Sequence, residues 1–398
     1  MKRTIVSVFG AATLAIAGLS ATISGATASP YDAGTAGALH AQRVCATATS
    51  GSASCFAKVM VNSKGVVPAS TTPAPSAKTP AQLQDAYKLT GGSGAGRTVA
   101  IVDAYGYTNL EADLATYRSY SGLPACTTAS GCLKIVDQDG GTNYPRMDVG
   151  WAGEQALDVD AVSAICPDCK IVVVQAKSNS FANLGAAVIQ ASKMAGVVAI
   201  SNSYGGGDAA DTTYGTYYNH PGIAVTASTG DNGYRGGSYP ASSSYVTAVG
   251  GTSLVAANNT RGWSESAWSG AGSGCSSYNV ALAAAATFDT GCARRAMADV
   301  SAAADPNSGG MAVYYPTSRT NSTWAQVGGT SESAPIIAAV YALAGGGYSN
   351  ATPYSHTSSL FDVTTGNNGS CPTTQWCVAR VGWDGPTGLG TPNGSGAF

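Results

Sequence analysis

Charged side chains are scarce in this chain. Lysine and arginine number 20, aspartate and glutamate 22, and together they make up 11% of the 398 residues, against about a quarter in an average domain. The net charge is −2 and the basic residues form no cluster. Because nucleic-acid binding depends on a basic surface, the sequence argues against a nucleic-acid partner. Few charges also limit self-repulsion when carboxylates titrate, which suits an acidic medium.

Long apolar runs are absent beyond the N-terminus. No later segment has the roughly 18 unbroken apolar residues that a membrane-spanning helix needs. The N-terminus has Lys2 and Arg3, the apolar run TIVSVFGAATLAIAGL, and then the small-x-small triplet Ala26-Thr27-Ala28. This order predicts a secretory signal peptide, residues 1–28, and a secreted, extracellular product without membrane contact after cleavage.

Ten cysteines in an exported chain indicate disulfides rather than metal ligands, because the thiols would meet an oxidising environment. Pairing neighbours in chain order is one of many possible connectivities. It gives Cys45/Cys55, Cys126/Cys132, Cys166/Cys169, Cys275/Cys292 and Cys371/Cys377. The motif CPDC, 166–169, can also be a redox centre, but the chain has no other oxidoreductase feature, which favours a structural staple.

Two regions that differ in composition and hydrophobic pattern follow the predicted signal peptide. Residues 29–78 are weakly patterned and run into the stretch VPASTTPAPSAKTP. Such a composition is extended and poorly packed, and it is typical of a linker or of a cleavable pro-segment. We therefore expect a zymogen with a short pro-segment and linker, 29–78, and a single catalytic domain, 79–398.

Apolar segments alternate with helical patterns in the second region. The strand candidates are 98–106, 170–176, 197–207 and 222–233, and the helix candidates are 109–122, 151–165 and 183–196. Fully apolar strands alternating with helices predict an α/β fold, a parallel sheet with helices on both faces. Sites in such sheets form at the carboxyl ends of the strands.

Ser331 is the candidate nucleophile. It lies in VGGTSESAP, where a glycine-rich turn leads into the apolar helical run IIAAVYALAG. We expect Pro335 in the first turn of that helix, where its missing N–H costs no hydrogen bond. The Ser331 N–H would then face an oxyanion formed nearby. Gly-Thr-Ser alone also suits a plain N-cap serine.

Histidine, the usual base for a serine nucleophile, is nearly absent. The chain has only His40, His220 and His356. His40 precedes the proline-rich stretch, and the other two lack the His-Gly-Thr-His type of sequence found in subtilisins. The sequence therefore does not favour a Ser-His-Asp triad.

Two acidic features offer an alternative base and an oxyanion donor. Glu154 and Asp158 lie one turn apart on a predicted helix, so they can share a proton and Asp158 can hold and polarise Glu154. Such a pair is otherwise a solvated helix face. Asp231, in TASTGDNG, follows a strand. A protonated aspartate can donate to an oxyanion there, although Asp-Asn-Gly is also a common turn.

The three motifs together, Glu154-x-x-x-Asp158, STGDNG and GGTSESAP, resemble the sedolisins, a family of serine-carboxyl peptidases. The similarity covers about 80–398 and implies a subtilisin-like fold. It also implies a Ser331-Glu154-Asp158 triad with Asp231 assisting the oxyanion.

The same resemblance extends to the substrate-binding strand. In SNSYG, Ser203 and Gly205 would offer backbone groups to an extended peptide, with Tyr204 where the family often has Trp. Asp103, at a strand end, would extend the carboxyl network behind the triad. The sedolisins usually carry a larger, folded pro-domain than this chain has room for.

The C-terminal segment LFDVTTGNNG…VARVGWDGPTGLGTP resembles the calcium loop of the family. It implies one structural Ca²⁺ held by carboxylates and backbone carbonyls. The implied ligands are Asp362, Val363, Arg380, Gly382 and Asp384, with Arg380 where glycine is frequent. Two aspartates in glycine-rich turns are the alternative.

The expected protein is thus a secreted, monomeric serine-carboxyl endopeptidase acting on proteins or peptides at acidic pH. Ser331 would form an acyl-enzyme with Glu154 as general acid and base. Two alternatives stay open. One is a subtilisin-type protease using Asp103, a histidine and Ser331, and the other is a non-catalytic binding module on a degenerate protease scaffold.

Overall fold

The structure, a computed structural model, describes residue 1, residues 38–346 and residues 348–398. The predicted signal peptide therefore lies outside the described residues, apart from residue 1. Ala36–Phe398 form one compact unit. Within the described part of the chain, no helix has the length and apolar character that a membrane crossing requires.

A central sheet forms the middle of this unit, with the strand order β12-β11-β9-β7-β4-β6-β5 and with β15 beside β11. The strands are β4 (Thr98–Ala104), β5 (Leu133–Asp137), β6 (Lys170–Ala176), β7 (Val197–Asn202), β9 (Ala224–Ser228), β11 (Thr247–Ala256), β12 (Trp263–Ala267) and β15 (Val300–Ala303). All neighbours are parallel except β11 and β12. Parallel strands need cover on both faces, which explains their apolar sequences.

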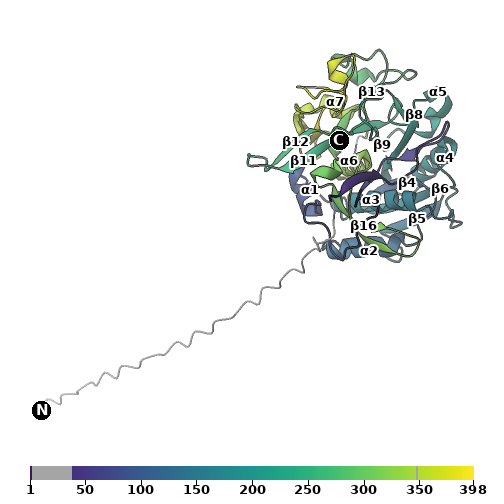
Figure 1. The fold of residues 1–398 in the computed structure, drawn as a ribbon, viewed down its shortest axis with the longest axis vertical. Helices are drawn as coiled ribbons and strands as arrows, with labels where there is room; N and C mark the ends of the chain where they lie inside the picture. The colour runs from purple at the N-terminus through teal and green to yellow at the C-terminus, as the bar shows by residue number, and fades with distance from the viewer. Residues whose placement is uncertain (2–37, 347) are drawn as a thin grey trace. The chain divides into compact units, whose positions relative to one another are not determined.

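Helices cover the two faces of the sheet. Those that share the larger apolar cluster are α1 (Pro80–Ala86), α2 (Leu110–Tyr120), α3 (Val149–Ile165) and α6 (Thr330–Ala344), whereas α4 (Phe181–Ser192) belongs to the other cluster. In Figure 1, α3 and α6 cross the middle of the view and α4 lies toward the right. The predicted α/β architecture, a mostly parallel sheet with helices on both faces, is confirmed.

The segment before α1 is well packed over much of its length. In it, β1 (His40–Arg43) and β3 (Lys58–Val61) extend an antiparallel sheet with β17 (Ser322–Gly328) and β16 (Met311–Pro316). Between them, β2 (Ser54–Cys55) pairs with β8 (Tyr204–Gly207), which also pairs with β10 (Ser238–Tyr239). The expectation of a poorly packed segment is therefore wrong for this part. A processing boundary near residue 78 stays a prediction.

Short elements complete the unit. They are α5 (Asp211–Tyr214), α7 (Thr352–Ser355), β13 (Gly274–Cys275), β14 (Ala296–Met297), β18 (Leu360–Phe361) and β19 (Thr391–Pro392). Disulfides join all five of the neighbouring cysteine pairs given above. The pairing of neighbours is thus confirmed, including the staple between Cys166 and Cys169.

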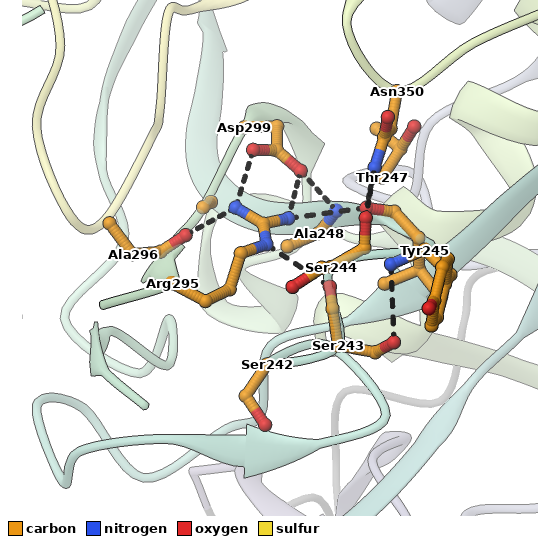
Figure 2. Close-up of polar contacts among 12 residues, drawn as sticks. Ser242, Ser243, Ser244, Tyr245, Thr247, Ala248, Arg295, Ala296, Asp299 and Asn350 are labelled. Carbon is orange, nitrogen blue, oxygen red and sulfur yellow. Dashed lines mark hydrogen bonds and ion pairs between the residues drawn. The ribbon is translucent and has the colours of Figure 1, made fainter. Parts of the chain in front are cut away.

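A buried ion pair ties two loops of the central sheet together (Figure 2). Arg295 Nη2 lies 2.5 Å from Asp299 Oδ2, and both side chains are almost inaccessible to solvent. Arg295 Nε also donates to the Ser243 carbonyl at 3.1 Å, and Ala248 N donates to Asp299 Oδ2 at 2.7 Å. Each charge also has further hydrogen-bond partners. The ion pair therefore fixes the loop before β11 and the loop before β15 relative to each other.

Candidate active site

Ser331 is the second residue of α6 and is completely buried. The helix begins after Gly329, whose φ of 112° is one that residues with side chains rarely adopt. Ser331 Oγ donates to the Ser203 carbonyl at 3.1 Å and accepts the Phe56 N–H at 3.2 Å. The hydroxyl therefore faces the segment that runs from β2 to β3.

The position of Pro335 differs from the expectation. It lies inside α6 rather than in the first turn, since the helix begins at Thr330. A proline there has no N–H to donate to the carbonyl one turn back, which belongs to Ser331. Ser203 Oγ lies 3.3 Å from that carbonyl oxygen and donates to Asp158 Oδ1 at 2.7 Å. The proline thus leaves the Ser331 carbonyl without its usual helical donor, and Ser203, which lies between β7 and β8, is next to that carbonyl.

Three carboxyl groups meet behind Ser331. Glu154 and Asp158 on α3 and Asp103 on β4 are all completely buried, so a solvated helix face is excluded. Glu154 Oε2 accepts the Ala57 N–H at 2.9 Å. Within the described part of the chain, Glu154 Oε1, Asp158 Oδ2 and both Asp103 carboxyl oxygens have no hydrogen-bond partner.

Burial raises the pKa of each of these carboxyls well above its usual range. The charge of Asp158 adds to the rise in the pKa of Glu154, while the Ser331 hydroxyl and the Ala57 N–H act against it. The charges of Asp158 and Glu154 likewise raise the pKa of Asp103. Unpartnered buried carboxylates are costly, so the cluster is suited to retaining protons that its members share.

Asp231 follows β9 and is 2% exposed, unlike a solvated Asp-Asn-Gly turn. Its Oδ1 accepts from Thr330 N at 2.8 Å and from Thr330 Oγ1 at 2.9 Å. Its Oδ2 has no partner among the described residues. Burial raises the pKa of Asp231 to about 6, although the Lys58 ammonium and the bonds from Thr330 oppose the rise.

The histidines lie elsewhere in the unit. His40 is exposed on β1, where it pairs with Val61. His220 Nε2 lies 2.9 Å from the Tyr217 carbonyl, and His356 Nδ1 lies 3.0 Å from the Thr352 carbonyl. None of these contacts is with Ser331, so the arrangement does not favour a histidine base.

The predicted substrate strand is occupied by the chain itself. Gly205 of β8 pairs with Ser54 and Tyr204 pairs with Cys55, and the Ser203 carbonyl accepts the Phe56 N–H at 3.3 Å. Sequence reasoning did not connect Phe56 and Ala57 to the site. The only local signal is the apolar run CFAKVMV directly after a cysteine.

The loop proposed for calcium brings two carboxylates to one turn. Asp362 Oδ2 accepts from Gly382 N at 2.9 Å, and Asp384 Oδ2 accepts from Arg380 N at 3.1 Å. The Asp362 charge contributes, after burial, to raising the pKa of Asp384 to about 7. In the parts that the structure describes, no group of three or more His, Cys, Asp or Glu side chains could hold a metal. The two carboxylates could still contribute oxygen ligands, the kind that Ca²⁺ prefers.

Comparison with known proteins bears on the family of this chain. The model of the Subtilase family matches residues 147–380, more than half of the chain. Kumamolisin from Bacillus sp. (strain MN-32) is 31% identical over 369 residues, covering 82% of this chain and 64% of Kumamolisin. The chain thus spans less than two thirds of that relative. Tripeptidyl-peptidase sed1 of Aspergillus fumigatus is 42% identical over 77 residues, 17% of this chain and 12% of that protein.

Solved structures show the same fold. Pseudomonas sedolisin, a serine-carboxyl proteinase complexed with pseudo-iodotyrostatin, superposes with a TM-score of 0.66 at 23% identity, over 82% of this chain and 96% of its own. A structure described as S41 Psychrophilic Protease gives a TM-score of 0.52 at 17% identity, over 80% of this chain and 99% of its own. At these identities the likeness concerns the fold alone.

Proposed function

The chain belongs to the subtilase family, in its sedolisin branch, and from that membership we propose that it is a serine-carboxyl endopeptidase active at acidic pH. The observation that carries the proposal is the buried carboxyl cluster of Glu154, Asp158 and Asp103 beside Ser331. A serine nucleophile needs a base next to it, and here a carboxyl group takes the place of histidine.

The proposed reaction is acyl transfer to water. Glu154 takes the proton of Ser331 Oγ as that oxygen attacks a peptide carbonyl. The Ser331 N–H and protonated Asp231 Oδ2 donate to the developing oxyanion. Glu154 then protonates the leaving amine, and water hydrolyses the ester on Ser331. Asp158 acts through Glu154, because its charge raises the proton affinity of that carboxyl.

The pH dependence follows from Asp231. Its pKa of about 6 means that the carboxyl is protonated, and able to donate, in acid. Above that pH it becomes a carboxylate that would repel the oxyanion. Activity should therefore fall as the pH rises toward 7.

Secretion, calcium binding, the substrates and the oligomeric state are proposed from the sequence and from the chemistry of the site. The predicted signal peptide and the five disulfides support secretion. We propose one structural Ca²⁺ bound by Asp362, Asp384 and the carbonyls of Val363, Arg380 and Gly382. Proteins or peptides are the proposed substrates, and a monomer is the proposed state.

The central test compares the purified protein with Ser331→Ala on a denatured protein substrate, from about pH 3 to about pH 8, which spans the carboxyl titration range. We expect activity below about pH 6 in the parent only. Equal activity in the two proteins, or no activity at any pH, would reject a peptidase. His220→Ala and His356→Ala should retain activity, and a large loss in either would favour the histidine-based alternative.

A further inference from the structure

An exposed apolar loop lies between the two cysteines of one disulfide, Cys275–Cys292. Residues 276–288, SSYNVALAAAATF, contain no charged side chain, and 280–286 are seven consecutive apolar residues. The exposed members of this loop include Tyr278, Val280, Ala281, Ala283 and Ala286, and the side chain of Val280 is 75% exposed. Contiguous apolar surface of this kind is a feature of interaction sites.

A second exposed aromatic residue lies beside this loop. Tyr245 is 43% exposed, and the residue before it, Ser244, donates from Oγ to the Val280 carbonyl at 2.7 Å. Three large exposed side chains, those of Tyr245, Tyr278 and Val280, thus lie close together. We call these three residues and the exposed alanines of the loop the apolar platform.

Buried hydrogen bonds hold the apolar platform in one conformation. Asn279, which is 3% exposed, donates from Nδ2 to the carbonyls of Ala209 and Ser242, both at 2.9 Å. Arg295 N donates to the Asn279 carbonyl at 2.9 Å. The Arg295 guanidinium also bonds the loop that carries Tyr245, so the buried ion pair supports both parts of the platform (Figure 2). A surface that is ordered beforehand loses little conformational entropy when a partner binds.

The apolar platform is attached to the end of the strand proposed to bind substrate. β8 ends at Gly207, and the next residue, Asp208, accepts from Ser277 N at 2.7 Å. Three residues further on, Asp211 N donates to Asn279 Oδ1 at 2.7 Å. The loop is therefore bonded directly to the residues that continue β8.

The distance from the nucleophile to the platform suits an extended peptide. Ser203, whose carbonyl accepts from Ser331 Oγ, precedes Asp208 by five residues, and five extended residues span about 17 Å. A peptide that pairs with β8 antiparallel, as β2 does, has its N-terminal part toward Gly207. No atom lies within 4 Å of a Cβ placed on Gly207, so the space beside the end of β8 is open.

An uncharged platform selects its partner by apolar burial alone, because it offers no charge to pair with. A folded protein keeps most of its large apolar side chains in its core, whereas an unfolded chain exposes them in extended segments. Acid also favours unfolding, since carboxylates that stabilise native proteins become protonated. The acidic pH proposed for the peptidase is thus a condition in which its protein substrates expose apolar segments.

From this arrangement we propose that the apolar platform is a docking site for an apolar segment of an unfolded protein substrate. The segment lies roughly six to ten residues before the cleaved bond, at the spacing of an extended chain. The proposal rests on the peptidase function proposed above and names its substrate class, long unfolded chains. Docking takes place away from the reacting atoms, so it lowers KM more than it changes kcat.

The test compares two quenched substrates that share the residues around the cleaved bond. Each has an N-terminal extension of about ten residues, which begins with Lys-Lys for solubility and continues with Leu, Val and Ala in one substrate and with Ser, Gly and Thr in the other. For the parent we expect kcat/KM to be at least about tenfold higher on the apolar substrate, mostly through KM, because burial of two apolar side chains suffices for that factor.

The double variant Tyr278→Ser/Val280→Ser should lose this preference. It should still hydrolyse a short peptide without an extension at the parental kcat/KM, since the platform lies beyond the reach of such a peptide. The matched control is Val255→Ser on β11, a valine that is 46% exposed outside the platform, which should retain the preference.

The same peptides separate this proposal from the peptidase function. If the short peptide is hydrolysed but the parent cleaves both long substrates equally well, or if the preference survives in the double variant, the docking site is wrong and the peptidase function stands. Dimerisation or binding to phosphatidylcholine vesicles that the double variant abolishes, without a preference between the long substrates, would assign the platform to a second copy or to a lipid surface and overturn the proposal. If the parent hydrolyses none of the three peptides, the peptidase function fails and the docking proposal fails with it.

Discussion

Asp231 and Thr330 are joined by two hydrogen bonds to one oxygen: Asp231 Oδ1 accepts from Thr330 N at 2.8 Å and from Thr330 Oγ1 at 2.9 Å. Because both donors use Oδ1, a proton on this carboxyl belongs on Oδ2. Oδ2 is the oxygen beside Gly329 and the Phe56 carbonyl. The pair therefore orients protonated Asp231 as a hydrogen-bond donor toward the Phe56 carbonyl.

Asp231→Asn should extend activity toward neutral pH. An amide keeps the acceptor toward Thr330 and donates to the oxyanion without needing a proton from solution. We expect kcat of the Asn variant to stay high above about pH 6, where kcat of the parent falls. Asp231→Ala should lower kcat by about 10²–10³ below that pH, where the parent carboxyl is protonated and can donate. If kcat of the Asn variant fell at the same pH as in the parent, a group other than Asp231 would be responsible for the fall.

Glu154→Gln should lower kcat by about 10²–10⁴, the usual contribution of a general acid–base group, with a smaller change in KM. The matched control is Glu111→Gln on α2. The Glu111 carboxylate accepts from Thr128, and this variant should leave kcat at the parental value. Steady-state kinetics on a quenched peptide decide the matter. A Gln variant as active as the parent contradicts the proposed role.

The raised pKa of Asp231 also predicts a pH-dependent stability. The folded protein holds the Asp231 proton more tightly than the unfolded chain does, so protonation of Asp231 stabilises the fold. This stabilisation is complete below the pKa of Asp231 in the unfolded chain, near 3.8, and is lost as the pH rises through about 6. This change corresponds to about 3 kcal/mol at about 1.4 kcal/mol per pH unit.

Urea unfolding of Ser331→Ala, with and without Asp231→Asn, measures this contribution without self-digestion. Between about pH 3.5 and about pH 7, the free energy of unfolding of the Asn variant should rise by about 3 kcal/mol relative to that of Ser331→Ala alone. A constant difference between the two proteins across this range would refute the assignment.

Arg295→Met should destabilise the protein by about 3–5 kcal/mol, because it leaves Asp299 buried without its counter-ion (Figure 2). The neighbouring exposed residue supplies the control. Arg294→Met loses a bond to the Tyr278 carbonyl, and its free energy of unfolding should stay within about 0.5 kcal/mol of the parent value. Equal losses in the two variants would argue against a special role for the buried pair.

Calcium should stabilise the C-terminal loop. Added at about 100 times its Kd, a ligand of the folded state alone contributes about 2.7 kcal/mol, so the Tm of Ser331→Ala should rise with Ca²⁺ and fall with a chelator. Asp362→Ala should abolish this response. Asp139→Ala, which removes an exposed carboxylate paired with Lys177, should retain it. A response that persists in Asp362→Ala places the ion elsewhere.

The α/β architecture was predictable because its signals are local. Buried parallel strands such as Lys170–Ala176 are continuous apolar runs, and short disulfides such as Cys126–Cys132 join cysteines close in sequence. The side chains proposed for catalysis were also found from the sequence. Their types, order and helical spacing suffice to name Glu154, Asp158, Asp231 and Ser331 as candidates.

The tertiary structure decided how these groups are used. The 275 sequence positions between Phe56 and Ser331 are bridged by pairing of β2 with β8 and of β3 with β17, and no local period encodes such pairing. Burial of the carboxyls, which raises their pKa values, likewise depends on the packing of α3 against α6 and β4. The sequence alone determines which reactive groups the chain carries. The fold determines where these groups meet, because strand pairing and burial arise from contacts between distant segments.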